Sequence, residues 1–276
     1  ANTNGIFECL KKGAEYIRWD EKRKKYAKQT GAVRRGVGMA LFSYKTGVWP
    51  ISLEIAGARL SLNQDGSVQL QLGATEIGQG ADTVFSQMVA ETLQTDMAHV
   101  HIQTVQDTDV SPFDTGAYAS RQSFVTGTAV KHCAEILRDK ILAYAKTLLP
   151  EVDTRELSLH DNWIWAGEER AISLAALAEE SYYSLTNSSV LTAEVSEQVK
   201  KNTIATGCCF AEVEVDIKLG KIKILHIINV HDSGKLLNPQ LAEMQVHGGM
   251  SMGMGYGISE QLILDEKTGR PLNGNL

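Results

Sequence analysis

The sequence predicts an α+β fold of two lobes, in which helices pack against mixed sheets built from hairpins. Apolar residues recur with a period of two in paired short segments joined by turn residues, and segments with a helical period follow these pairs. Each half of the chain shows the order hairpin, polar loop, helix. Because the strands cluster by hairpin and do not alternate singly with helices, the pattern favours α+β over a doubly wound sheet.

The first half opens with an expected helix over 4–29, which Gly31 ends, followed by a strand over 32–46. The Asp65-Gly66 pair is a strong turn signal and predicts a hairpin. Pro150 ends the last helix of this half. The remaining expected elements are strands over 54–62, 68–72 and 100–104, a helix over 83–93, a loop over 107–117 and a long helix over 123–149.

The second half is less regular up to residue 206 and then repeats the hairpin pattern. The expected elements are a short strand over 163–165, a helix over 174–181, a strand over 190–195, hairpin strands over 208–217 and 222–230, a helix over 240–259 and a final strand over 261–265. We therefore expect an N-terminal helix within 1–31 and two lobes, about 32–150 and 151–276.

Charge and composition limit the classes of function. The chain of 276 residues carries a formal net charge of -6, and an acidic chain is a poor candidate for nucleic-acid binding. Its dense basic run, 22–25, stands among acidic residues on an expected helix and predicts a solvated face. The sequence contains no apolar run long enough to span a membrane. Four cysteines without a C-x-x-C pair predict neither a zinc site nor a disulfide framework, and the expected location is the cytoplasm.

The loop Gly73-Ala-Thr-Glu-Ile-Gly-Gln-Gly80, between an expected strand and a helix, resembles a phosphate-binding loop. It lacks the lysine of a P-loop, and Thr83 replaces the third glycine of a dinucleotide fingerprint. Gly78 and Gly80 allow a ligand to approach the backbone closely, and Gln79 both donates and accepts hydrogen bonds. A tight turn between strand and helix explains the loop equally well. Glu76 either orients the loop amides or faces water.

A second cluster of small and hydrogen-bonding residues, 115–123, precedes the long helix. Helix capping explains one or two of Ser120, Gln122 and Ser123, but the whole cluster suggests a backbone pressed against a polar ligand. Three nearby acids lack the order of a calcium-binding loop and are expected to be solvated turn residues: Asp107, Asp109 and Asp114.

The third candidate is the glycine-rich helix over 243–257. Glycines at 249, 253 and 257 leave one helix face nearly without side chains, for which close packing on another backbone is one reason. Gln245 lies before this face and is a candidate ligand contact, whereas His247 is expected to be an ordinary hydrogen-bonded histidine. The spacing of the histidines predicts no protein-bound metal site.

Three motifs in this order resemble the molybdenum-cofactor subunit of the xanthine dehydrogenase and aldehyde oxidase family. They are the loop 73–80, Tyr118-Ala-Ser-Arg-Gln-Ser123, and 230–240 followed by Gln245-Val-His-Gly-Gly249. The resemblance runs from about Val33 to the end and is to the C-terminal cofactor-binding half of a bacterial xanthine dehydrogenase-like subunit. It implies a molybdenum cofactor-binding fold that holds molybdopterin, often as the cytosine dinucleotide, with a molybdenum centre carrying oxo, sulfido and hydroxide ligands.

The same resemblance implies an activity, partners and site residues. The family hydroxylates purines, other N-heterocycles or aldehydes with oxygen from water, and electrons leave through iron–sulfur clusters and FAD on other domains or subunits. In this chain the resemblance assigns the pterin or its phosphate to Gly78, Gln79 and Gly80, the lining beside molybdenum to Ala119 and Ser120, and further cofactor contacts to Gln122 and Gln245.

Two departures from the family pattern limit what this chain is expected to do. The family's base is a glutamate in a Gly-Glu motif downstream of the glycine-rich helix; no glutamate here matches it, and Glu260 precedes its place. The substrate loop of the first cofactor-binding half is also absent. We therefore expect a piece of a larger protein that carries half a cofactor site, pairs with the first half and is inactive alone. The alternatives are a non-catalytic binding or assembly module on the same fold and a nucleotide-binding protein.

Overall fold

The computed structural model describes residues 5–103 and 105–274. The chain forms two compact units, which we name by their place in the sequence. The central unit is Lys45–Thr203, and the terminal unit joins Ala1–Tyr44 with Ile204–Leu276. In the described part of the chain the strands form three sheets, one of them mixed, with the orders β1-β9-β10, β4-β3-β2-β8 and β5-β6-β7. The α+β prediction is confirmed.

The main sheet of the central unit is built on the predicted hairpin of β2 (Ile55–Leu62) and β3 (Val68–Leu72). Its turn is closed by the carboxylate of Asp65, which accepts the Ser67 N–H at 2.9 Å, and by Gly66 at φ +83°. β8 (Thr192–Gln198) pairs antiparallel with β2, and β4 (Val100–Ile102) pairs parallel with β3.

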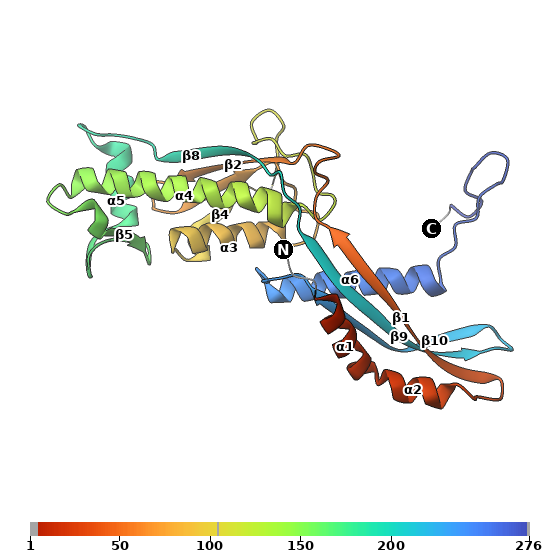
Figure 1. The fold of residues 1–276 in the computed structure, drawn as a ribbon. Coiled ribbons are helices and arrows are strands. Elements are labelled where there is room, and N and C mark those ends of the chain that lie inside the picture. The colour runs from red at the N-terminus through yellow and green to blue at the C-terminus, as the bar shows by residue number, and fades with distance from the viewer. Residues whose placement is uncertain (1–4, 104, 275–276) are drawn as a thin grey trace. The chain divides into compact units, whose positions relative to one another are not determined.

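Two helices pack on this sheet and enclose the core of the central unit (Figure 1). They are α3 (Ala81–Leu93) and the long α4 (Gln122–Leu148). Alternate residues of β2 and β3 are buried, so one face of the hairpin supplies aliphatic side chains to this core. The core includes Leu60, Leu70, Phe85, Val130 and Leu137. The loops that precede the two helices are thereby anchored on packed elements.

A small antiparallel sheet completes the central unit. It consists of β5 (Leu157–His160), β6 (Trp163–Ala166) and β7 (Glu169–Ser173), of which only β6 is predicted by the sequence. Short 3-10 turns at Met97–His99 and Thr154–Glu156 precede β4 and β5. α5 (Leu174–Tyr183) follows β7 directly and is capped by the Ser173 hydroxyl, which accepts the Ala176 N–H.

The terminal unit is a three-stranded sheet with helices. Its strands are β1 (Val33–Lys45), β9 (Ile204–Asp216) and β10 (Lys221–Asp232), and β9 and β10 form the second predicted hairpin. α1 (Ile6–Ile17) packs against β9 and β10, and α2 (Trp19–Tyr26) follows it. α6 (Pro239–Ile258) begins after Asn238, whose side chain accepts the Leu241 N–H at 3.0 Å.

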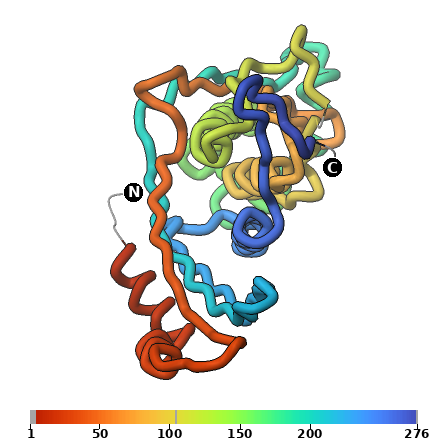
Figure 2. Tube along the Cα trace, turned by 90° about the vertical axis from the view of Figure 1, so that its right-hand side faces the viewer, coloured from red at the N-terminus to blue at the C-terminus, as the bar shows by residue number. Residues whose placement is uncertain are grey.

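The prediction of a single helix over 4–29 is wrong: two helices form, separated at Arg18, and the second ends at Tyr26. Residue 4 lies outside the described part. Arg18 adopts left-handed geometry with φ +61° and ends α1. The axis of α2 therefore runs in a different direction from that of α1 (Figure 2). The turn brings Trp19 edge-on against Phe210 with ring centroids 5.6 Å apart. Tertiary packing therefore overrides an unbroken helical pattern.

The structure also differs from the sequence prediction in the strands expected over 261–265 and 100–104. The final strand over 261–265 does not form; Leu264 makes only an isolated bridge to Pro271. β4 ends at Ile102, and Thr104 of the expected strand lies outside the described residues. The expected lobes, about 32–150 and 151–276, remain a prediction. The two compact units of the structure are divided at 44/45 and 203/204.

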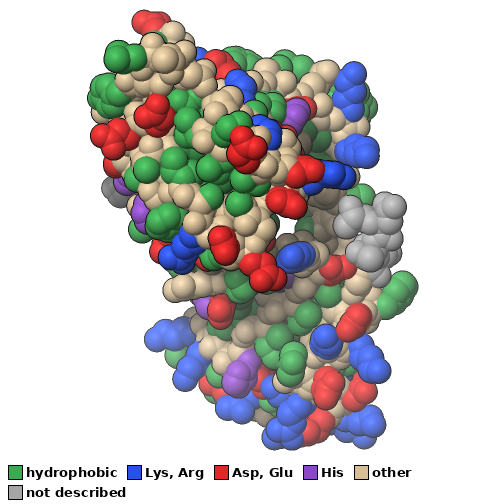
Figure 3. Space-filling model, turned by 90° about the vertical axis from the view of Figure 1, so that its left-hand side faces the viewer, with side chains coloured by type: hydrophobic (Ala, Val, Ile, Leu, Met, Phe, Trp, Pro, Cys, Tyr) green, Lys and Arg blue, Asp and Glu red, His purple; other side chains and the backbone are tan. Residues whose placement is uncertain are grey.

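The basic run on α2 is partly a solvated face, as expected. Arg23, Lys24 and Lys25 are exposed, and basic and acidic side chains intermingle at the lower end of the view in Figure 3. Lys22 differs, because its Nζ lies 2.6 Å from the carboxylate of the buried Glu212. Within the described residues, no helix combines the length and hydropathy needed to cross a membrane.

Candidate functional site: two loops at the helix starts of the central unit

The glycine-rich loop before α3 is organised by its own carboxylate. Glu76 Oε1 accepts the N–H groups of Gly78 at 2.7 Å and Gly80 at 3.0 Å, and Oε2 accepts that of Asp82 at 3.1 Å. Asp82 lies in the first turn of α3, so the positive end of this helix already holds a negative charge. Of the two roles considered for Glu76, the structure shows the first: it orients the loop amides.

The charge state of this loop follows from these contacts. Burial raises the pKa of the Glu76 carboxyl, but the backbone N–H groups of Asp82, Gly80 and Gly78 outweigh burial and bring that pKa below its ordinary value. Burial and the Glu76 charge raise the pKa of Asp82. Glu76 therefore stays ionised at neutral pH, and its presence disfavours a second anion at the same helix end.

The glycines of this loop have separate uses. Gly78 and Gly80 have φ values of +97° and +86°, which a residue with a Cβ adopts only at a cost. A Cβ at Gly78 would meet nothing within 4 Å, so this side of the loop is open. A Cβ at Gly73 would lie 2.1 Å from the Pro112 carbonyl oxygen. Gly73 thus allows the glycine-rich loop to touch the segment that leads to the second loop.

Gln79 of the glycine-rich loop and Gln122, the first residue of α4, meet directly. Gln79 Nε2 donates to Gln122 Oε1 at 2.6 Å and to the Thr75 carbonyl at 3.0 Å, while Gln79 Oε1 accepts the Ile77 N–H at 2.6 Å. Gln122 Nε2 also donates to the Thr75 carbonyl, at 3.2 Å. The structure therefore brings together two residues that the sequence analysis singled out. Gln79 Nε2 thus has two acceptors inside the protein, whereas Gln122 Nε2 has one acceptor among the described residues and one hydrogen left to donate.

Ala119 and Ser120 form a left-handed turn immediately before α4. Their φ values are +50° and +52°, which is unusual for two consecutive residues other than glycine. The Ala119 carbonyl accepts the Gly47 N–H at 2.8 Å. In the described part of the chain, the Ala119 and Ser120 N–H groups have no acceptor. The turn therefore presents two backbone donors and the exposed Ser120 hydroxyl.

Arg121, which anchors this turn, is not marked as a functional residue by the local sequence pattern. Arg121 is fully buried, with Nε 2.5 Å from Glu54 Oε2 and Nη1 2.5 Å from Asp114 Oδ1. The expectation that Asp114 is a solvated turn acid is wrong, because its side chain is 0% exposed. The positions of Asp114 and Arg121 near one another were visible in the sequence, but Glu54 lies 67 residues before Arg121 and no local pattern connects them.

The donors and acceptors of the two loops fit a pterin-like group better than a triphosphate. The Thr115 hydroxyl is buried and has no hydrogen-bond partner among the described residues. Arg121 is the one basic residue within 73–83 and 115–123, and its guanidinium forms ion pairs with two buried carboxylates. What remains are backbone N–H groups, hydroxyls and the Gln122 amide, a neutral set that matches mixed donors and acceptors. These residues thus fit molybdopterin on their chemistry.

Gln245 belongs to the terminal unit, where it is exposed on α6. A hollow of about 690 Å³ lies between β10, the loop after it and α6; Val246 and His247 line it, as does His231, whose pKa burial lowers. His247 is exposed, and its Nε2 lies 3.8 Å from the Glu243 carboxylate, which is too far for a hydrogen bond. Within the described part of the terminal unit, a Cβ at glycine 249, 253 or 257 would meet nothing within 4 Å, so this unit packs no backbone of its own closely on that face.

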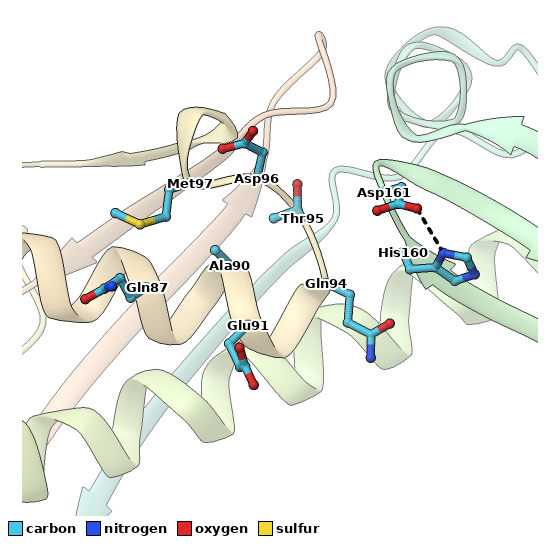
Figure 4. A pocket seen from close by; sticks show the side chains of 9 residues that line it. All are labelled: Gln87, Ala90, Glu91, Gln94, Thr95, Asp96, Met97, His160 and Asp161. Atoms are coloured by element: carbon cyan, nitrogen blue, oxygen red, sulfur yellow. Dashed lines mark ion pairs between the residues drawn. The ribbon is translucent and has the colours of Figure 1, made fainter. Parts of the chain in front are cut away.

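The central unit also has a broad hollow of about 1000 Å³ at the C-terminal end of α3 (Figure 4). Glu91, Asp96 and Asp161 give it an acidic lining, and His160 Nδ1 pairs with Asp161 at 3.5 Å. The hollow is lined by α3, the segment after it and the β5–β6 turn, and not by the two loops described above. We therefore place the candidate site at the Gln79–Gln122 contact and not at this hollow.

Comparison of the sequence with known proteins identifies relatives of this chain. A model of the molybdopterin cofactor-binding domain matches residues 12–276. The chain is 48% identical over 275 residues to a protein of Escherichia coli K12 described as a putative xanthine dehydrogenase molybdenum-binding subunit, XdhA, covering 99% of this chain and 36% of that protein. It is 31% identical to the probable hypoxanthine oxidase XdhD of the same organism, covering 98% of this chain and 27% of the relative. The chain thus spans about a third of the length of these relatives.

Solved structures show the same fold. The Cu,Mo-CO dehydrogenase in its carbon monoxide reduced state superposes with a TM-score of 0.84 at 23% identity, covering 98% of this chain and 36% of that one. Quinoline 2-oxidoreductase from Pseudomonas putida 86 superposes with a TM-score of 0.81 at 21% identity, covering 94% of this chain and 35% of that one. The α+β arrangement of hairpins and helices is therefore also that of the matching parts of these two enzymes.

Proposed function

The chain belongs to the molybdopterin cofactor-binding domain family, and from this premise we propose that it forms one wall of the cofactor site in a molybdenum hydroxylase. The enzyme's proposed substrates are purines, other N-heterocycles or aldehydes. When bound, the cofactor supplies the molybdenum centre at which oxygen from water is transferred and electrons are taken up. We propose that iron–sulfur and FAD domains or subunits accept these electrons.

In this proposal the chain's own residues hold and orient the pterin. Ala119 and Ser120 offer backbone N–H groups beside the metal centre, and Gln122 offers its remaining amide hydrogen. Gln79 fixes Gln122 through their amide contact, and the open backbone at Gly78 lets the ligand approach. The contact from Gln245 stays a prediction from the family motif.

The observation that carries the proposal is the hydrogen bond of 2.6 Å between Gln79 Nε2 and Gln122 Oε1. It joins, in one unit, two of the motifs on which the family resemblance rests. Neutral amides at this junction suit a pyranopterin and its neutral ring donors and acceptors, whereas a triphosphate requires free cations. A nucleotide-binding function is disfavoured for the same reason.

A first experiment measures cofactor content in the complete protein that carries this sequence. We expect molybdenum by elemental analysis and pterin by fluorescence after oxidation, and we expect Gln122→Ala to lower both. Gln71→Ala is the matched control, because Gln71 is a half-buried amide of the same unit that bonds Arg59. Neither molybdenum nor pterin in the folded wild-type protein would favour a non-catalytic binding or assembly module instead.

A second experiment concerns this chain alone. Because its glutamates include none that matches the family's base, we expect no turnover of xanthine or an aldehyde with an artificial electron acceptor. Turnover by the purified chain at a rate above that of a heat-inactivated sample would contradict the proposal that catalysis needs the remainder of the site.

A further inference from the structure

Arg121 carries a full charge in the interior of the central unit. The guanidinium is 0% exposed, and the side chains of its partners Glu54 and Asp114 are 1% and 0% exposed. Removing charges from water is costly, and well-packed apolar residues often stabilise an interior as well as a buried ion pair does. A gain in stability therefore does not by itself explain why these three charged side chains are buried together.

The guanidinium joins three segments of the chain. Besides the two carboxylates, Nη1 donates to the Gly116 carbonyl at 2.9 Å and Nη2 donates to the Ile55 carbonyl at 2.8 Å. Glu54 in turn accepts the Val48 N–H at 2.5 Å. The segment 47–55, the loop 112–116 and the start of α4 thus meet at one planar, multidentate group, which lysine cannot replace.

The turn of Ala119 and Ser120 is held from both sides by this cluster. Arg121 follows the turn directly, and Gly47, next to Val48, donates its N–H to the Ala119 carbonyl. Left-handed backbone at two residues with side chains is unfavourable and persists only where the surroundings determine it. The guanidinium anchors both neighbours of this turn, the start of α4 and, through Glu54, the segment that supplies the Gly47 contact.

We propose that Arg121 is a positioning residue, which with Glu54 and Asp114 locks Ala119 and Ser120 in the left-handed turn whose N–H groups face the cofactor. This inference rests on the proposed function, because it takes that turn to contact molybdopterin. Arg121 itself touches no cofactor and acts only through the two residues before it.

The test uses the cofactor-loaded protein and the variant Arg121→Lys, which keeps the charge but loses the multidentate contacts. We expect faster hydrogen exchange at residues 119 and 120 and about tenfold faster release of molybdenum and pterin, as is usual when a supporting hydrogen-bond partner is removed. Arg59→Lys is the matched control. Arg59 bonds Glu194, Gln71 and the Val110 carbonyl in the same unit and has no contact with the turn.

A rescue experiment separates positioning from general stability. Glycine reaches positive φ without the cost that other residues meet, so Ala119→Gly and Ser120→Gly added to Arg121→Lys should recover part of the lost cofactor retention. A purely structural role predicts no such recovery. Should Arg121→Lys not fold, Asp114→Asn removes one charged partner with little change of shape, and we expect the same direction of effect.

The outcomes distinguish this inference from the proposed function. A loaded wild-type protein whose Arg121→Lys variant retains cofactor as well as Arg59→Lys does, or whose glycine variants give no recovery, would overturn the inference alone. A folded wild-type protein without molybdenum and pterin would overturn the proposed function and the inference with it.

Discussion

At the residue scale, Glu76 determines what the glycine-rich loop can bind. Its carboxylate accepts three backbone N–H groups at the start of α3, the place where a phosphate would bind in a nucleotide-binding loop. These N–H groups are therefore already bonded to a carboxylate and are not available to a phosphate. What it offers outward is the open backbone around Gly78 and the Gln79 contact to Gln122.

We expect Glu76→Gln to lower the free energy of unfolding by about 1 kcal/mol, as for the loss of a charged cap at a helix N-terminus. The pKa of Glu76 is lower in the folded chain than its ordinary value, so its stabilisation is fully present above the ordinary value of 4.5 and is lost as pH falls through the folded-state pKa. The difference between wild type and variant should thus shrink in acid.

Urea denaturation at neutral and acidic pH measures this difference. Glu91→Gln is the control, since Glu91 is exposed on the same helix but lies near its C-terminal end, where a negative charge is not stabilising. An equal loss of stability in both variants, or a difference that grows as pH falls, would contradict the assigned role of Glu76.

At the element scale, close packing in the terminal sheet depends on single glycines. A Cβ at Gly207 of β9 would lie 2.3 Å from the Phe42 ring and 2.5 Å from the backbone oxygen of Val230 on β10. The backbone oxygen is part of the β9–β10 ladder, in which Cys208 pairs with Val230. The backbone oxygen cannot move without disturbing the sheet, and the tip of the Phe42 ring would have to shift as well.

Gly207→Ala should therefore destabilise the chain by about 2 kcal/mol through overpacking, measured by thermal or urea unfolding. Gly36→Ala on β1 of the same sheet is the matched control, because a Cβ there would meet nothing within 4 Å. We expect the control to stay within about 0.5 kcal/mol of wild type. Equal stability of the two variants would show that the sheet relaxes around Gly207.

At the scale of the whole molecule, the two units have separate cores. The larger core lies entirely between Ala56 and Val195, inside the central unit. The smaller one contains Cys9, Ile17, Val37, Cys208 and Phe210, all in the terminal unit. The anchored turn and its Arg121 cluster lie wholly within the central unit.

Residues 45–203 expressed alone should accordingly fold, because the segment retains its whole core and every contact of Arg121 described above. We expect cooperative thermal unfolding by circular dichroism and dispersed amide signals in an NMR spectrum. Gradual unfolding without dispersed signals would contradict this expectation and show that the central unit depends on the terminal unit.

The sequence by itself determined the α+β class, both hairpins, the long helix and the family motifs. These depend on local properties: apolar period, turn residues and the residue types of short loops. It also placed Gln79 and Gln122 in separate ligand loops, although their direct contact was not foreseen.

Only the tertiary structure decided how these loops are held. Glu54 and Arg121 meet across 67 positions, Arg18 breaks a regular helical pattern so that Trp19 packs on Phe210, and Asp114 is buried where solvent was expected. The physical reason is the same in each case. The energy that selects the conformation comes from desolvation and contact between segments distant in the chain, and local patterns do not encode which segments meet.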